Sequence, residues 1–239
     1  MKSLTESFIR RVCVHARMCD YIPAWGSTTR MLFLWVNRKV EEVEVNGGKF
    51  MLAAQFRNIG SETEWGFEGI YGPVGEGSRE SFGEELGDAL RMWDIPWMLS
   101  GDFITNRFPN ERTRGKVVSR VMEKFSKFID YHSLVDLPLR GAFYTWSRSE
   151  DSSSRSRLNR FLVSTSLGEL VCNVIQIPLL RLVSDHSPFL LDCNKGNRGR
   201  SPSRFENMWL RVDDFKDRVG SDGAAMRWRG GLLSDLPKS

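Results

Sequence analysis

The chain has 239 residues, of which 41% are hydrophobic and 27% are charged, which is the composition of a globular protein rather than a disordered one. No apolar run reaches the roughly 18 residues that a membrane helix needs, and the N-terminus lacks the continuous apolar core of a signal peptide. The net charge of +4 permits a polyanionic partner without requiring one.

The first part of the chain predicts one helix and three strands. Apolar residues recur at helical intervals over residues 3–18. Strands are expected over residues 31–36, 49–56 and 65–73, with the turn sequence Asn-Gly-Gly at 46–48 just before the second.

The central part alternates further strands with two amphipathic helices. The first helix is expected from Ser78, a candidate N-cap, to about Trp93, and the second from about Val117 to Tyr131. Strands are expected at WMLSGDF, GAFYTWS and SDHSPFLLDC. Strands interleaved with helices indicate a layered domain.

A domain boundary is expected at residue 194, where Gly, Ser, Arg and Asn become frequent. Residues 1–194 would form the folded domain and residues 195–239 a basic linker and tail. The stretch RFENMWLRVDDFKDRV within that tail is a candidate short helix.

Two arginine-rich stretches, Arg148–Arg160 and Asn194–Arg204, contain few acidic residues. They are either solvated loops or contacts to phosphate groups. The four cysteines have no metal-ligand spacing, so we expect free, buried thiols of an intracellular protein; they are Cys13, Cys19, Cys172 and Cys193.

Two short motifs carry groups capable of chemistry. Asp185 and His186 are adjacent, so both can reach one site only where a strand ends and the chain bends. A His there can act as a base or contact a phosphate, and an Asp can hold a divalent cation. Asp102 follows an apolar strand in the same way. For either motif taken alone, a turn in which the aspartate caps a backbone N–H is the more ordinary explanation.

The order of the motifs is more specific than any one of them. GIYGP, PWMLSGDFI, FSKFIDYHSLVDLPLRGAFYTWS, SRLNRFL, SDHSP and RFENMWL follow one another. This series resembles the endonuclease/exonuclease/phosphatase superfamily, which includes DNase I, and most closely the endonuclease domain of plant LINE-type retrotransposons. The resemblance covers residues 25–219.

The resemblance implies an α+β fold, a DNase I-like four-layer α/β/β/α sandwich of two mixed sheets. It also implies Mg²⁺-assisted phosphodiester hydrolysis. Carried over by position, Asp102 would orient or activate the attacking water and His186 would contact the scissile phosphate. Asp185 would help to hold the metal, and Tyr71 would hydrogen-bond the phosphate or the leaving group.

The chain departs from the family pattern at several of these positions. Ile104 stands where the family has an Asn beside the GDF aspartate, and Asn159 stands where an Asp accepts a hydrogen bond from the catalytic His. The family's WN.RG and QETK motifs, the second of which supplies a metal-binding Glu, are absent, and Thr29-Arg30 replaces a usual Gly pair. No reverse transcriptase, which normally follows, fits after RFENMWL. We therefore expect a truncated, degenerate domain that lacks the first strands, is marginally stable and has weak or no Mg²⁺ binding.

Three functions remain open. The first is an inactive remnant of a retrotransposon endonuclease, and the second is a residually active nuclease or phosphatase. The third is a non-catalytic nucleic-acid-binding module that uses the arginine stretches and aromatics such as Trp146 and Trp209, although both could simply pack in the protein. Any retained function would imply DNA as partner and access to the nucleus, with no membrane and no small-molecule cofactor; the oligomeric state stays open.

Overall fold

The computed structural model describes residues 19–22, 31, 33–115, 117–148, 153–170, 174–181 and 184–193, with the backbone alone for 19–22. All of them belong to one compact unit of the chain, Met1–Gly196. The expected N-terminal helix, the Thr29-Arg30 pair, the candidate helix with Trp209 and the tail lie outside the described residues. The expected domain boundary at residue 194 therefore stays a prediction.

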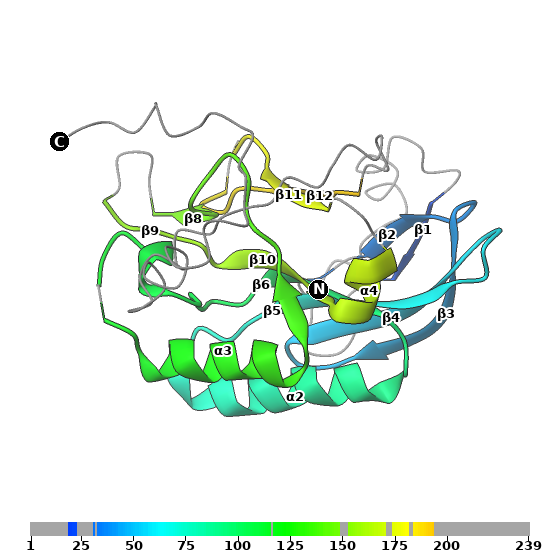
Figure 1. Ribbon diagram of the computed structural model, residues 1–239, viewed down its shortest axis with the longest axis horizontal. Helices are drawn as coiled ribbons and strands as arrows, with labels where there is room; N and C mark the ends of the chain where they lie inside the picture. The colour runs from blue at the N-terminus through cyan, green and yellow to red at the C-terminus, as the bar shows by residue number, and fades with distance from the viewer. Residues whose placement is uncertain are drawn as a thin grey trace, which may run out of the picture. The chain divides into compact units, whose positions relative to one another are not determined.

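A six-stranded mixed sheet is the centre of the fold (Figure 1). Only the neighbours β5 and β6 run parallel, and the remaining pairs are antiparallel. The strand order is β3 (Val40–Gly47), β4 (Met51–Asn58), β5 (Glu64–Tyr71), β6 (Trp97–Asp102), β10 (Asn159–Ser164) and β7 (Leu134–Asp136).

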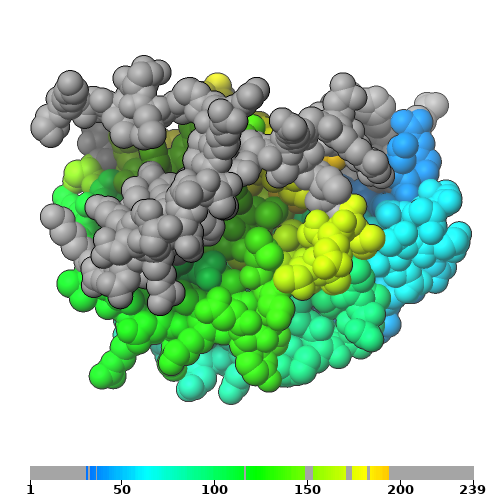
Figure 2. Space-filling view, viewed as in Figure 1, coloured from blue at the N-terminus to red at the C-terminus, as the bar shows by residue number. Residues whose placement is uncertain are grey.

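Two helices cover one face of this sheet (Figure 1). They are α2 (Arg79–Met92) and α3 (Arg120–Tyr131), and they lie side by side, joined by a Lys124 Nζ–Glu80 Oε1 contact of 3.6 Å. Both helices lie at the surface of the protein, along the lower part of the view in Figure 2. Their apolar sides pack on the sheet because apolar residues recur at helical spacing; the shared core includes Phe82, Leu86, Ala89, Phe125, Ile129, Leu99 and Leu162.

Smaller elements cover the opposite face. The pair β1 (Cys19–Ile22) and β2 (Phe33–Val36) lies over β4 and β5, where Phe33 meets Phe67 edge-on at 5.0 Å. The pair β11 (Ile175–Pro178) and β12 (Phe189–Asp192), with α4 (Thr165–Leu170), packs over β6 and β10. The described residues thus form a helix layer, a mixed sheet and further strands, which confirms the expected α+β class.

Several element boundaries differ from the expectation. Helix α3 begins three residues later than Val117, because the Ser119 side chain accepts a hydrogen bond from Met122 N and fixes the N-cap there. Ser78 occupies the N-cap position of α2, but its side chain makes no capping bond. Of GAFYTWS only β8 (Trp146–Ser147) is strand, paired with β9 (Arg155–Ser156), and of SDHSPFLLDC only β12.

A buried ion network of Glu111, Asp136, Arg157 and Arg160 lies where strands β10 and β7 pair in the central sheet. Arg160 is fully buried and contacts Asp136 at 2.5 Å and Glu111 at 2.9 Å, and Arg157 contacts the same two acids. Burial raises the pKa of Glu111, but the two arginines outweigh it, so that pKa lies below its ordinary value. The network fixes the loop before Glu111 to the start of β10, next to Asn159.

One core carboxyl group has no such partner. Glu68 on β5 is fully buried, and neither of its side-chain oxygens has a hydrogen-bond partner. It shares the helix-facing side of the sheet with Ile70, two residues along the strand. Burial, and then the nearby Glu85, raise the pKa of Glu68 well above its usual value.

The described part of the chain has no helix of the length and apolar character needed to span a membrane.

Candidate active site

The strand registers bring three of the expected site residues together. Tyr71 ends β5 and Asp102 ends its parallel neighbour β6, and the two are register partners. Asn159 begins β10 and is the register partner of Asp102 on the other side. Directly opposed residues of neighbouring strands lie about 5 Å apart, so these three side chains originate in one row at the sheet's edge.

Asp102 is held in a nearly buried position, with 6% of its surface exposed. Its Oδ1 accepts a hydrogen bond from Ile104 N at 2.9 Å. Burial raises the pKa of Asp102, while the Ile104 bond and His186 oppose that effect. Gly101 precedes it with φ of 149°, and a Cβ there would lie 2.0 Å from Ile70 O, so only glycine allows β5 and β6 to approach here.

The imidazole ring of His186 lies between the side chains of Asn159 and Asp102. Its Nδ1 is 2.7 Å from Asn159 Oδ1, and its Nε2 is 3.6 Å from Asp102 Oδ2. An amide oxygen can only accept a hydrogen bond, so Nδ1 carries the proton. The sequence placed Asn159, His186 and Asp102 in one site, and the structure brings all three into contact.

A short antiparallel pairing positions both members of the Asp-His motif. Thr145 O accepts from Ser187 N at 2.7 Å, and Asp185 O accepts from Ser147 N at 3.0 Å. Trp146 is the bridge partner of His186 between these two bonds. Asp185 and His186 therefore occupy an extended segment at the mouth of the site.

Trp146 has a role that the sequence did not indicate. Its indole Nε1–H donates to Asp185 Oδ2 at 2.9 Å, and this bond is the main reason that the pKa of Asp185 lies below its ordinary value. The neighbouring Thr145 is fully buried, and its hydroxyl oxygen accepts from Leu158 N and Asn159 N. A polar partner for Asp185 was not predictable, because nothing in the motif sequences pairs these two side chains.

Ile104 adopts a left-handed backbone conformation, with φ of 50°. That conformation is unusual for a β-branched residue and readily adopted by asparagine. The backbone therefore has the shape that an asparagine would favour, while the side chain present is an alkyl group with no hydrogen-bond donor. A strained residue of this type costs about 1–3 kcal/mol.

Tyr71 lies beside Asp102 with 38% of its surface exposed. Its backbone N–H donates to Phe50 O at 2.9 Å, which fixes the end of β5. The position suits a side chain that reaches toward a ligand at the sheet's edge.

The described residues offer few protein ligands for a Mg²⁺ ion. Asp185 is exposed, and its Oδ2 already accepts the Trp146 hydrogen bond. Within the described ranges, no group of three or more His, Cys, Asp or Glu side chains is placed to hold a metal. Mg²⁺ takes near-octahedral oxygen coordination and usually keeps several waters, so the carboxylates of Asp185 and the nearby Asp102 would have to supply the protein ligands among the described side chains of the site.

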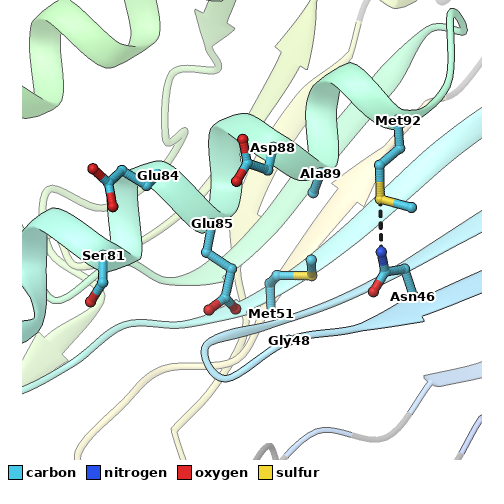
Figure 3. A pocket seen from close by; sticks show the side chains of 9 residues that line it. All are labelled: Asn46, Gly48, Met51, Ser81, Glu84, Glu85, Asp88, Ala89 and Met92. Carbon is cyan, nitrogen blue, oxygen red and sulfur yellow. Dashed lines mark hydrogen bonds between the residues drawn. The ribbon is translucent and has the colours of Figure 1, made fainter.

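A separate hollow of about 370 Å³ lies between α2 and the β3–β4 turn (Figure 3). Glu84, Glu85 and Asp88 line it, and Glu85 also accepts a hydrogen bond from Phe50 N. None of the expected site residues lines this hollow, so it is not part of the candidate site.

Comparisons with known proteins identify the fold. Neither a protein-family model nor a curated protein matches the sequence. Among solved structures, the endonuclease domain of TRAS1, a telomere-specific non-LTR retrotransposon, has 14% identity and a TM-score of 0.57, covering 74% of this chain and 80% of that one. An endonuclease/exonuclease/phosphatase family protein from Bacteroides thetaiotaomicron has 16% identity and a TM-score of 0.55, covering 77% and 76%.

A third similar structure is TDP2 of D. rerio complexed with a single-strand DNA product, at 10% identity and a TM-score of 0.50, covering 76% and 77%. Nucleases and phosphatases thus share this architecture. The chain has the DNase I-like fold of endonuclease/exonuclease/phosphatase proteins, as the motif series predicted.

Proposed function

We propose that the chain is a degenerate relative of a LINE-type retrotransposon endonuclease and that it is catalytically inactive. The motif series in the sequence supports the retrotransposon origin, and the likeness to the TRAS1 endonuclease domain is consistent with it. DNA is the partner that this origin implies, and TDP2, a protein of the same fold, is known with a DNA product.

The observation that carries the proposal is the His186–Asn159 pair. The amide oxygen of Asn159 lies 2.7 Å from Nδ1 of His186 and carries no charge. A carboxylate at this position would stabilise the protonated imidazole as well as orient it, and an amide can only orient it. In the serine-protease triad the same Asp-to-Asn change lowers turnover about 10⁴-fold.

Ile104 adds a second defect of a different kind. Hydrolysis of a phosphodiester builds up negative charge, which preorganised donors stabilise. The side chain of Ile104, two residues after Asp102, supplies none, and losing one such donor typically lowers the rate about 10²–10³-fold. Asn159 therefore weakens the stabilisation of the protonated His186 ring, and Ile104 weakens the stabilisation of charge on the phosphate. The small number of protein ligands for Mg²⁺ is a third defect.

A residually active nuclease or phosphatase is the second candidate. It is favoured by the survival of Asp102 and His186 in contact, 3.6 Å apart. Such an enzyme would need a divalent cation and would lose its activity in His186→Ala.

A supercoiled-plasmid nicking assay separates the two candidates. The purified chain is incubated with Mg²⁺ or with EDTA, alongside His186→Ala and alongside Tyr131→Ala, an exposed residue on α3 far along the chain from the site. The proposal predicts no difference between any of these samples while circular dichroism shows folded protein. Nicking that requires both Mg²⁺ and His186 would refute inactivity.

A further inference from the structure

The side chains of His186 and Asp102 face each other without a hydrogen bond. Nε2 of His186 lies 3.6 Å from Oδ2 of Asp102, which is too long for a hydrogen bond between nitrogen and oxygen. The hydrogen bonds that position the two side chains use their other atoms, Nδ1 of His186 and Oδ1 of Asp102. The pair Nε2 and Oδ2 therefore takes no part in holding the site together.

The amide of Asn159 decides which nitrogen of His186 faces Asp102 with a lone pair. Because an amide oxygen only accepts, Nδ1 carries the proton of the neutral ring and Nε2 keeps its lone pair. A hydrogen bond from Nδ1–H is also the contact by which proteins fix a histidine that binds a metal through Nε2. His186 thus presents a metal-binding nitrogen to Asp102, and not an N–H group that could donate to a phosphate oxygen.

The distance between the two atoms favours one coordination geometry over another. In a tetrahedral site with bonds of about 2.0–2.2 Å, two ligand atoms lie about 3.3–3.6 Å apart. In an octahedral Mg²⁺ site with bonds of about 2.0–2.1 Å, adjacent ligand atoms lie only about 2.8–3.0 Å apart. The observed 3.6 Å agrees with the tetrahedral spacing. The pairing of an imidazole nitrogen with an oxygen also suits Zn²⁺, whereas Mg²⁺ prefers oxygen ligands alone.

A cation can reach the two atoms from the side of His186, whose side chain is 30% exposed. The neighbouring Asp185 lies exposed at the mouth of the site, and its negative charge also acts on Asp102. The described ranges contain no group of three or more His, Cys, Asp or Glu side chains placed to hold a metal. Water would therefore complete the coordination, as in zinc sites that keep an open position, and binding should be weak.

We infer that Nε2 of His186 and Oδ2 of Asp102 together bind a borderline divalent cation, for which Zn²⁺ is the probe, in preference to Mg²⁺. The replacement that leaves a neutral amide beside His186 thus changes which ion the site accepts, because it fixes the neutral ring with its lone pair toward Asp102. The inference goes beyond the proposed function, since it concerns binding alone and requires no hydrolysis.

Titration of the ¹⁵N-histidine-labelled chain with Zn²⁺ tests the inference at the site itself. The Nε2 resonance of His186, assigned with His186→Ala, is expected to shift as Zn²⁺ binds, while Mg²⁺ in large excess should leave it unmoved. The resonances of His132, which follows α3, should not move in either titration. Zinc bound by any of the four cysteines elsewhere would also leave the His186 resonance in place.

Substitutions of the two supporting residues separate a metal site from a chance contact. Asp102→Asn removes a ligand and should weaken Zn²⁺ binding at His186 at least about ten-fold. The control Asp88→Asn removes a carboxylate on α2 whose side chain is 74% exposed and should bind as the parent does. Asn159→Leu removes the acceptor for Nδ1–H and should weaken binding by about 10–100-fold, whereas Asn159→Asp keeps an acceptor and should retain it. Circular dichroism confirms that each variant is folded.

Three results would each overturn the inference. They are a His186 resonance that Zn²⁺ does not move, an equal shift with Mg²⁺, and unchanged binding in the folded Asp102→Asn variant. The outcome is separate from that of the nicking assay. Nicking that needs Mg²⁺ and His186 would refute inactivity, and Zn²⁺ binding would still be decided by the resonance of His186.

Discussion

The replacement Glu68→Met should stabilise the protein, because it removes a carboxyl group that the core cannot satisfy. Glu68 is fully buried, and neither oxygen has a hydrogen-bond partner. Methionine has a similar length, contains no strong polar group and adapts to irregular spaces. The replacement should therefore keep the packing beneath α2 and remove the desolvation penalty.

The size of the effect follows from the two unpaired oxygens. A buried polar group left without a partner typically costs about 1–3 kcal/mol, so Glu68→Met, which removes one carboxyl group, should raise the free energy of unfolding by about 1–3 kcal/mol at neutral pH. The control Glu80→Gln changes a carboxylate of α2 that is 79% exposed, and it should change that free energy by less than about 0.5 kcal/mol.

The stability of the parent should also depend on pH in a defined direction. The pKa of Glu68 is raised in the folded state, so between its unfolded and folded pKa the folded state binds more protons. The free energy of unfolding then falls as the pH rises above the unfolded pKa of about 4.3. The contribution of Glu68 is complete below that value and is lost as the pH passes the folded pKa.

Urea unfolding at pH 5 and pH 8, followed by tryptophan fluorescence, measures both effects. The gain from Glu68→Met should be larger at pH 8 than at pH 5. An unchanged or lowered midpoint in Glu68→Met, with the m-value preserved, would show that Glu68 is satisfied in the native protein and that the reasoning is wrong.

Two further substitutions test the scaffold around the site by the same unfolding measurement. In Glu111→Gln, Arg157 and the fully buried Arg160 share a single acid, Asp136. The replacement should lower the free energy of unfolding by about 3–5 kcal/mol. A loss below about 1 kcal/mol would mean that the network does not stabilise the fold. Thr145→Val removes the oxygen that accepts from Leu158 N and Asn159 N and should lower it by about 2 kcal/mol, whereas an unchanged value would show that these N–H groups find other partners.

Much of the fold was predictable because its main elements have clear local signals. The strands β4, β5 and β6 and the helix α2 appear at the expected positions, since apolar periodicity and turn residues mark their ends. Strand β3 was missed because it is an edge strand with charged, exposed residues such as Glu41, Glu42 and Glu44. Charged residues protect an edge strand from pairing with another chain. They also remove the alternation of apolar and polar residues by which a strand is recognised in a sequence.

The residues of the candidate site were predictable from the sequence, but the contacts that hold them in position were not. The motif series placed Asp102, Asn159 and His186 in one site, and the structure joins them. The Trp146–Asp185 bond could not be predicted, because it depends on how two short segments pair. Likewise, no local pattern indicates that Arg160 is buried, since its partners lie 24 and 49 residues away along the chain.

The tautomer of His186 is the most direct test of the claim that a neutral amide, that of Asn159, holds this histidine in place. The chain has three histidines, so ¹⁵N-histidine labelling with His186→Ala for assignment gives a readable imidazole spectrum. The account predicts a proton on Nδ1 of His186, donated to Asn159 Oδ1, and a changed imidazole spectrum in Asn159→Asp. A His186 ring protonated on Nε2 alone, or a spectrum unchanged in Asn159→Asp, would contradict it.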